Sequence, residues 1–369
     1  MNKYKINVYA ISKNEEKHVK RWVESMSEAD GIYVLDTGST DNTVEELRKL
    51  GVNVKTKNFD VFRFDEARNE SLKLLPEDTD ICVCTDIDEV FNVGWRKKIE
   101  SEWSENQTLG RYILNASLDE NGKPLVSFYI NKIHTLKDYK WIYPVHEVLE
   151  FVGEKEKTGE LSITLNHIPD NSKSRGQYLK LLELAYKEQP ENDRVLHYLG
   201  REYMYYERWN DAIDMLIKHL NLPNSVWKEE RCASMRFISR CYVNLKRVEE
   251  ARMWLNKAIL EAPHLRDPYV ELSYLEYTEK NYNKAKELML KALSIESNPK
   301  TYINESFSYN YFVYDILSIC EYYLGNKKDA ITYLKKAIKM EPNIKRLKDN
   351  LKIMESQENS WDFFFWKKE

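Results

Sequence analysis

The chain has 369 residues, of which 42% are hydrophobic and 31% are charged, and its formal net charge is −4. This length suits two domains, each large enough to bury a core of its own. The slightly acidic balance lacks the basic surface that nucleic-acid binding requires, so no nucleic-acid partner is expected.

The cysteines and the N-terminal sequence indicate a reduced, cytoplasmic protein. The five cysteines are an odd number, and none has the spacing of a CxxC or zinc-finger motif. The opening stretch "MNKYKINVYAISKNEEK" has no apolar run long enough for a signal peptide. No window approaches the roughly 18 apolar residues of a membrane span, so we expect no span.

Strand-like and helical patterns alternate in the first part of the chain. Runs rich in β-branched and aromatic residues lie at 5–11, 31–37, 52–59 and 80–86, and helical patterns lie between them at 14–26 and 43–51. This alternation predicts βαβ units and a parallel sheet. Between about residues 110 and 167 the strand-like runs follow one another directly, with a turn at "ENGKP". They predict a mixed or antiparallel extension of the sheet.

From about residue 177 onward, helical patterns follow one another and repeat. Four segments share a small residue with an apolar residue four positions later: Ala212 and Leu216, Ala251 and Leu255, Ala285 and Met289, and Ala330 and Leu334. Three of them carry a second alanine seven positions after the first, at Ala258, Ala292 and Ala337, and a proline soon after. The first segment has His219 at that second position.

This pattern resembles the tetratricopeptide repeat, whose paired helices need small residues where they cross and a proline where the unit ends. The resemblance implies an all-α solenoid with a groove suited to extended peptides. We place the repeat domain at 173–352, the α/β domain at 1–172 and an aromatic tail at 353–369. The tail is expected to fold back onto the last repeat or to mediate self-association as a homodimer.

Acidic residues follow two of the predicted strands. Asp86, Asp88 and Glu89 come directly after the run "ICVC", and Asp36 ends an earlier strand. Carboxylates this close together repel one another and lose hydration, so a cationic group is expected beside them. Because ligands bind beyond the carboxyl ends of parallel strands, Asp36 and Asp86 are expected to line one crevice.

Four ordered elements resemble the family 2 glycosyltransferases of the GT-A fold, a Rossmann-like nucleotide-sugar domain with a mixed sheet. They are the opening strand with "SKNEE", then "DTGSTDNT", "FDEARN" and the acidic segment at 86–89. The resemblance assigns donor binding to Ala10, Ser12, Asp36, Arg68 and Asp86. It assigns Asp88 to a metal, Mn²⁺ or Mg²⁺, because such hard cations prefer oxygen ligands and bridge diphosphates.

Three residues near the end of this domain are further candidates. The repeat-bearing members of the family that this chain resembles have a His-Glu pair after an aromatic residue, here His146 and Glu147 in a strand-like context. We favour Glu147 as the base that removes the acceptor's proton and His146 as an orienting group; the alternative is a structural, salt-linked edge. The resemblance also makes His167 a metal ligand, with a packing histidine as the alternative.

The resemblance implies a metal-dependent, inverting glycosyltransferase. It would move a hexose from a nucleotide-diphosphate sugar, UDP-glucose or UDP-N-acetylglucosamine, to a peptide or protein side chain held by the repeats. This matches the repeat-bearing enzymes that glycosylate cysteine in bacteriocin peptides. The alternatives are a cell-surface glycan or lipid-linked acceptor, and a catalytically inactive scaffold.

Overall fold

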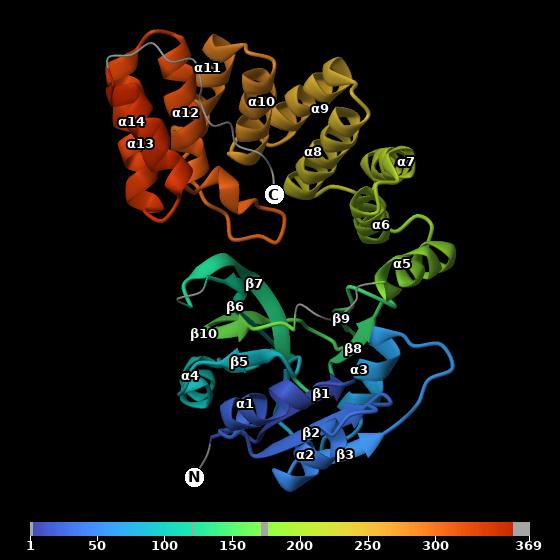
Figure 1. Cartoon of the computed structure of the whole chain (residues 1–369). Coiled ribbons are helices and arrows are strands. Elements are labelled where there is room, and N and C mark those ends of the chain that lie inside the picture. Colours follow the sequence, from blue (N-terminus) through green and yellow to red (C-terminus); the bar gives the residue numbers. More distant parts are fainter. Residues whose placement is uncertain (1–2, 120–121, 171–175, 357–369) are drawn as a thin grey trace. The chain divides into compact units, whose positions relative to one another are not determined.

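The computed structural model describes residues 3–119, 122–170 and 176–356, and the chain forms two compact units (Figure 1). The first unit runs to residue 189 and includes residues 300–302; the second comprises residues 190–299 and those from 303 on. This division lies later in the chain than the predicted boundary at residue 172. The predicted aromatic tail lies, from residue 357 on, outside the described residues.

The first unit is built on an eight-stranded mixed sheet with the strand order β3-β2-β1-β4-β7-β6-β10-β5. Its strands are β1 (Ile6–Ser12), β2 (Gly31–Asp36), β3 (Asn53–Thr56), β4 (Ile81–Cys84), β5 (Glu89–Phe91), β6 (Leu109–Leu118), β7 (Pro124–His134) and β10 (Thr158–His167). The strands β1 to β4 pair in parallel, and β7 is antiparallel to both β4 and β6. The predicted parallel core with a mixed extension is confirmed.

The first unit also contains helices and a small hairpin. The helices are α1 (Glu16–Met26), α2 (Thr43–Lys49), α3 (Phe64–Leu72), α4 (Trp95–Glu102) and α5 (Gln177–Glu188). Helix α1 buries Val19, Trp22 and Met26, which lie on one helical face and join the core of the sheet. β8 (Tyr139–Ile142) and β9 (Val148–Phe151) form a separate antiparallel pair, and β8 packs beside α3 (Figure 1).

The second unit is all-helical in its described part, as predicted. Its helices are α6 (Asp193–Tyr205), α7 (Trp209–Asn221), α8 (Lys228–Asn244), α9 (Val248–Glu261), α10 (Asp267–Thr278), α11 (Tyr282–Leu293), α12 (Tyr311–Tyr323), α13 (Lys327–Met340) and α14 (Lys345–Glu355), with a 3₁₀ turn at Ser306–Ser308. The alanines of the repeat pattern are all fully buried. Small residues therefore stand where successive helices pack against each other, as the repeat requires.

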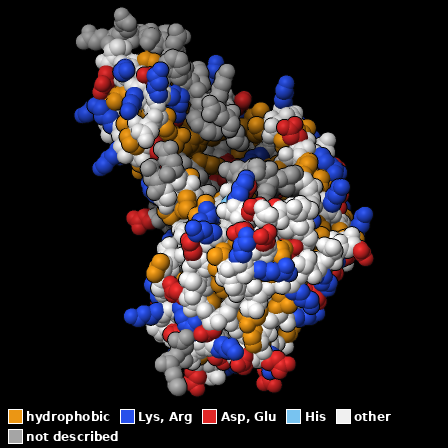
Figure 2. Space-filling model, turned by 60° about the horizontal axis from the view of Figure 1, so that its bottom comes forward, with side chains coloured by type: hydrophobic (Ala, Val, Ile, Leu, Met, Phe, Trp, Pro, Cys, Tyr) orange, Lys and Arg blue, Asp and Glu red, His pale blue; other side chains and the backbone are white. Residues whose placement is uncertain are grey.

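The surface has no dominant charge in the view shown. Figure 2 shows basic and acidic side chains interspersed over the visible face, in keeping with the small net charge. Within the described ranges, no helix combines the length and the hydrophobicity that crossing a lipid bilayer demands.

Candidate active site

The parallel strands bring the first donor-binding candidates to one edge of the sheet. In the register of β1 and β2, Ser12 lies opposite Asp36, and both residues end their strands. The Ser12 hydroxyl donates to Asp36 Oδ2 at 3.0 Å. Asp86 follows β4, which pairs with the other side of β1. The structure thus places these three candidates at the same strand ends, with Ala10 buried in β1.

Asp36 is fully buried, and hydrogen bonds satisfy its carboxylate. Oδ1 accepts from the backbone N–H groups of Gly38 and Ser39 at 3.1 and 3.0 Å, and Oδ2 accepts from the hydroxyls of Ser12 and Ser39. Gly38 has φ +100°, a left-handed conformation that glycine adopts without strain. The carboxylate therefore shapes the loop after β2, and four donors offset the cost of burying it.

Asp86 is balanced by two cations of the protein itself. Arg68 Nη2 lies 2.7 Å from Asp86 Oδ1, and Lys132 Nζ lies 3.1 Å from Oδ2. Burial raises the pKa of Asp86, but the charges of Arg68 and Lys132 outweigh it and hold that pKa well below its usual range. The cation expected beside the acidic segment is thus, for Asp86, a pair of side chains.

Arg68 is the centre of this cluster rather than an exposed residue of α3. The residue is only 3% exposed, its Nε donates to the Glu147 carboxylate, and its Nη1 donates to Cys84 Sγ at 3.2 Å. The planar fork of arginine can hold two carboxylates at once, which a lysine cannot do in a fixed geometry. Arg68 thereby joins Asp86, on the predicted donor side, to Glu147, the predicted base.

Lys132 was missed by the sequence analysis. It lies on β7, with Ile130 and Ile133 as apolar neighbours, and its Nζ also approaches Glu89 at 3.5 Å. Glu89 is buried, which raises its pKa, and its side chain accepts from the backbone N–H of Asp86 at 2.8 Å. The available signal was a lysine next to the apolar Ile133 in a strand-like run, because a charge that becomes buried there needs a partner.

The two predicted metal ligands meet. Asp88 Oδ2 and His167 Nε2 are 3.2 Å apart, and the backbone N–H of Ile168 donates to the Asp88 carbonyl at 2.8 Å. Both side chains are partly exposed, Asp88 by 23% and His167 by 33%. Burial lowers the pKa of His167, but the hydrogen bond to Asp88 and its charge raise it to about 9. A divalent cation held by these two side chains would replace the proton that His167 shares with Asp88.

The predicted strand context of His146 and Glu147 is wrong. Residues 143–147 form the connection between β8 and β9, and His146 has φ +52° in the left-handed region. Pro144 explains the difference, because proline has no N–H to continue a strand ladder. The alternation of faces expected for a strand therefore does not apply. Glu147 turns to Arg68, and the His146 ring lies 5.8 Å from that of Tyr178.

Buried hydrogen bonds connect β8, the strand before this loop, to β1, β7 and α3. Trp141 Nε1 donates to the Tyr9 hydroxyl at 2.8 Å, and that hydroxyl lies 2.7 Å from His134 Nε2. Asn69 of α3 bonds both the N–H and the carbonyl of Trp141, at 2.9 and 2.8 Å. Burial lowers the pKa of His134 to about 4, so this imidazole is neutral. The β8–β9 loop and α3 are thereby held together around Arg68.

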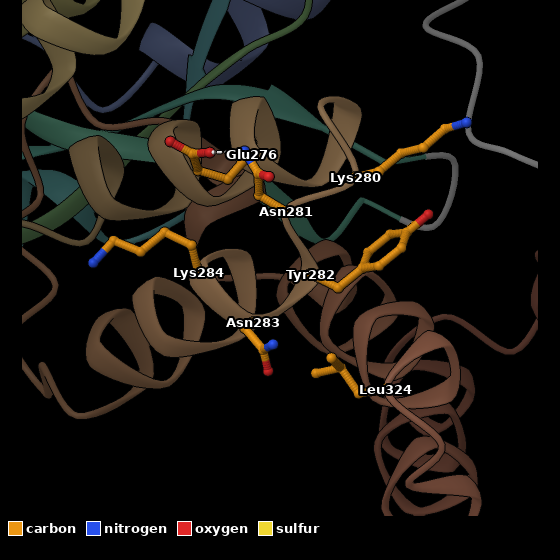
Figure 3. A pocket seen from close by; sticks show the side chains of 7 residues that line it. All are labelled: Glu276, Lys280, Asn281, Tyr282, Asn283, Lys284 and Leu324. Carbon is orange, nitrogen blue, oxygen red and sulfur yellow. Dashed lines mark hydrogen bonds between the residues drawn. The ribbon is translucent and has the colours of Figure 1, made fainter.

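A cavity of about 480 Å³ in the second unit contains none of the predicted site residues. Figure 3 shows its lining side chains, which are Leu324 after α12 and six residues around the turn between α10 and α11: Glu276, Lys280, Asn281, Tyr282, Asn283 and Lys284. Asn281 donates to Glu276 at 2.7 Å across this turn.

Two family models account for the two parts of the chain. Residues 8–146 match glycosyl transferase family 2, and residues 237–264, 267–299 and 313–344 match the tetratricopeptide repeat. The chain therefore carries a family 2 glycosyltransferase domain followed by tetratricopeptide repeats. Both predicted resemblances are confirmed at this level. The first repeat-like segment, with Ala212 and His219, lies outside the matched residues.

No curated protein matches the chain. Among solved structures, a crystal structure of MamA is 22% identical, with a TM-score of 0.35, over 44% of this chain and 81% of that chain. PilF of Pseudomonas aeruginosa is 14% identical, with a TM-score of 0.39, over 47% of this chain and 72% of that one. A tetratricopeptide repeat protein of Thermus thermophilus is 19% identical, with a TM-score of 0.36, over 48% of this chain and 91% of that one.

Proposed function

We propose that the first unit transfers a hexose from a nucleotide-diphosphate sugar, UDP-glucose or UDP-N-acetylglucosamine, to a peptide or protein side chain with inversion. The glycosyltransferase family sets the reaction class. The observation that carries the proposal is the meeting of Asp88 and His167 at 3.2 Å beside Asp86, where parallel strands end. Ligands of open α/β sheets bind at such ends.

Asp88 and His167 would hold the divalent cation. The imidazole beside the carboxylate favours Mn²⁺ over Mg²⁺, because Mg²⁺ is bound almost entirely by oxygen. A cation bound there supplies positive charge that stabilises the departing nucleoside diphosphate. Both side chains are accessible enough for a ligand to reach them.

Among the remaining donor-binding candidates, some would contact the donor directly and others would hold the contacting residues in place. Asp86 has 37% of its side chain exposed, whereas Arg68 is almost completely enclosed. We therefore assign Asp86 to the ribose and give Arg68 the role of holding Asp86 and Glu147 in place. Ser12 and Asp36 are buried, so they would act on the base by fixing the loop after β2 through hydrogen bonds, and Ala10 would lie behind them in the core of the sheet.

Glu147 is the proposed base, and Arg68 fixes the direction of its carboxylate. In one displacement the acceptor's proton passes to Glu147, the acceptor atom bonds to the anomeric carbon, and the bond from that carbon to the diphosphate oxygen breaks. The electron pair leaves with the nucleoside diphosphate. A positioned base of this kind typically accelerates proton removal by about 10²–10⁴-fold. His146, next in the loop, would orient the acceptor.

The experiment that tests this function uses a panel of sugar nucleotides with Mn²⁺. Release of the nucleoside diphosphate and the mass gain of serine- and cysteine-containing peptides are measured. Asp88→Asn should lower Mn²⁺-dependent release by about 100-fold or more, because a neutral amide oxygen binds a divalent cation more weakly than a carboxylate does. Asp78→Asn, at an exposed pair with Lys5, is the matched control. Unchanged release in Asp88→Asn would contradict the metal assignment, and transfer to glycans alone would contradict the peptide acceptor.

A further inference from the structure

The second unit buries a group of potential metal ligands in the repeat that departs from the pattern. His197 of α6, His219 of α7 and Glu230 of α8 are all buried. One ligand atom from each side chain lies within 4.8 Å of those from the other two. Three successive helices therefore converge on one point with two imidazoles and a carboxylate.

The hydroxyl of Ser234 connects the two imidazoles. Ser234 Oγ lies 2.8 Å from His197 Nδ1 and 2.9 Å from His219 Nδ1. On the other side of the His219 ring, Nε2 lies 2.9 Å from Ser225 Oγ and 3.5 Å from Glu230 Oε1. Because Ser234 has one hydroxyl proton, it donates to one imidazole and accepts from the other.

The tautomer of His219 sets the direction of this chain of hydrogen bonds. With the proton on His219 Nε2, on the side of Glu230, His219 Nδ1 accepts from Ser234. Ser234 then accepts from Nδ1–H of His197, so Nε2 of His197 carries a lone pair. That nitrogen is enclosed and has no hydrogen-bond partner among the described residues.

His219 lies at a position of the repeat that is alanine in the later repeats. The equivalent places in the later repeats hold Ala258, Ala292 and Ala337, all fully buried where helices pack. An imidazole there brings a larger volume and two polar nitrogens into a core that elsewhere uses a methyl group, and each change costs stability without compensation. A buried polar atom without a partner in a native protein calls for an explanation such as a bound ion or water.

We propose that His197, His219 and Glu230 bind a transition-metal cation of the Zn²⁺ type, which ties α6, α7 and α8 together. Two imidazoles and one carboxylate are a donor set that Zn²⁺ accepts, and a fourth position goes to water or a serine hydroxyl. Small side-chain rotations bring the three ligand atoms to coordination distance and replace the Ser234 bridge. The metal stabilises the one repeat-like segment that lacks the alanine pair, independently of sugar transfer.

The test measures metal content and Co²⁺ absorption in the full-length chain. Asp88→Asn serves as the background, so that the sheet edge of the first unit does not contribute a cation. One equivalent of Zn²⁺ by elemental analysis, and visible d–d bands when Co²⁺ replaces it, are expected. His219→Ala, which installs the residue of the later repeats, and the isosteric Glu230→Gln should each weaken Co²⁺ binding at least tenfold. His264→Ala is the control, because His264 forms an exposed pair with Glu229.

A second measurement needs no variant at the cluster. Zn²⁺ should slow hydrogen exchange in α6, α7 and α8, because a ligand that binds only the folded state stabilises it by mass action. The absence of Co²⁺ bands, together with unchanged exchange, would overturn the proposal and leave a hydrogen-bonded network with a buried water. Full Co²⁺ binding by both His219→Ala and Glu230→Gln would overturn it as well, since the metal would then lie elsewhere.

Discussion

The first unit and the first repeat-like segment of the second unit each bury a polar cluster, but they balance it differently. The sheet-edge cluster (Arg68, Asp86, Lys132 and Glu147) pairs full charges. The repeat cluster (His197, His219, Glu230 and Ser234) joins imidazoles through a hydroxyl. Paired charges fix a geometry strongly, but losing one member leaves another charge buried. The imidazole–hydroxyl contacts of the repeat cluster join no charge pair, and His197 Nε2 has no hydrogen-bond partner among the described residues.

The largest expected effect is on catalysis and concerns the sheet-edge cluster alone. Glu147→Gln keeps the shape of the side chain but removes the proposed base, so transfer should fall about 10²–10⁴-fold while donor and metal binding persist. Loss on a cysteine peptide should be smaller than on a serine peptide, since a thiol is already partly ionised near neutral pH. The measurement is the rate of mass gain on paired peptides.

The control for this variant is Glu150→Gln in the same hairpin, at an exposed pair with Lys140. It should leave the rate within a factor of two or so, as expected for a surface pair of small energetic weight. If Glu147→Gln transfers at the wild-type rate to either peptide, Glu147 is structural and His146 is the next candidate for the base.

The second prediction removes the cation at the centre of the sheet-edge cluster. Arg68→Met leaves Asp86 and Glu147 without their shared partner, and breaking a buried pair in this way costs about 3–5 kcal/mol. The free energy of local unfolding is measured by hydrogen exchange of β4. Lys73→Met is the control, because Lys73 forms an exposed pair with Glu70 and should cost under about 1 kcal/mol. Equal losses in the two variants would show that Arg68 carries no more than a surface charge.

Much of the fold was predictable because local sequence patterns determine it. The parallel strands, the helices predicted at 14–26 and 43–51 and the repeated alanines all follow from periodicity within short windows, and each was found. The error at His146 is also local: Pro144 interrupts a run that is otherwise rich in aromatic and β-branched residues. The neighbouring residues have a high strand propensity, but Pro144 has no N–H to continue the strand.

The candidate site residues were chosen one by one from the sequence, but their pairing could not be read from it. Arg68 and Glu147 are 79 residues apart in the chain, and Lys132 and Asp86 are 46 apart. No short-range spacing encodes such contacts, which depend on which strands become neighbours in the sheet. The acidic segment correctly predicted a nearby cation, yet whether a metal or a side chain supplies it depends on packing. Here Asp86 pairs with the side chains of Arg68 and Lys132, and Asp88 pairs with His167.

Acid should affect the repeat cluster before it affects Asp86. The pKa of His197 is about 3 in the folded chain against 6.5 for an ordinary histidine, so the unfolded chain binds the extra proton and stability falls as pH drops from 6.5 toward 3. Going from pH 7 to pH 5 should cost about 2 kcal/mol at α6–α8. The depressed pKa of Asp86 acts only below its ordinary value of 3.8, outside this window.

The measurement is hydrogen exchange of α6–α8 at pH 7 and pH 5, corrected for intrinsic rates and made with a chelator present. His197→Phe should remove most of the difference, because the variant has no imidazole to protonate in the unfolded state. His134 contributes an acid dependence of its own to the first unit, so each unit is compared only with its own variant. An equally large pH difference in His197→Phe would contradict the neutral state of the repeat cluster.

The smallest expected effect comes from the second cation of the sheet-edge cluster. Lys132→Met removes the partner of Asp86 Oδ2 and Glu89, but Arg68 still holds Oδ1, and more than a third of the Asp86 side chain reaches solvent. The cost in unfolding free energy should therefore be about 1–2 kcal/mol, below that of Arg68→Met, since water can reach the freed oxygen of Asp86. Because Asp86 is the proposed ribose contact, the KM for the sugar nucleotide should rise more than kcat falls, and Lys132→Arg should restore most of the affinity. A loss of stability as large as that of Arg68→Met would show that the two cations share the buried charge equally, and an unchanged KM would separate Lys132 from donor binding.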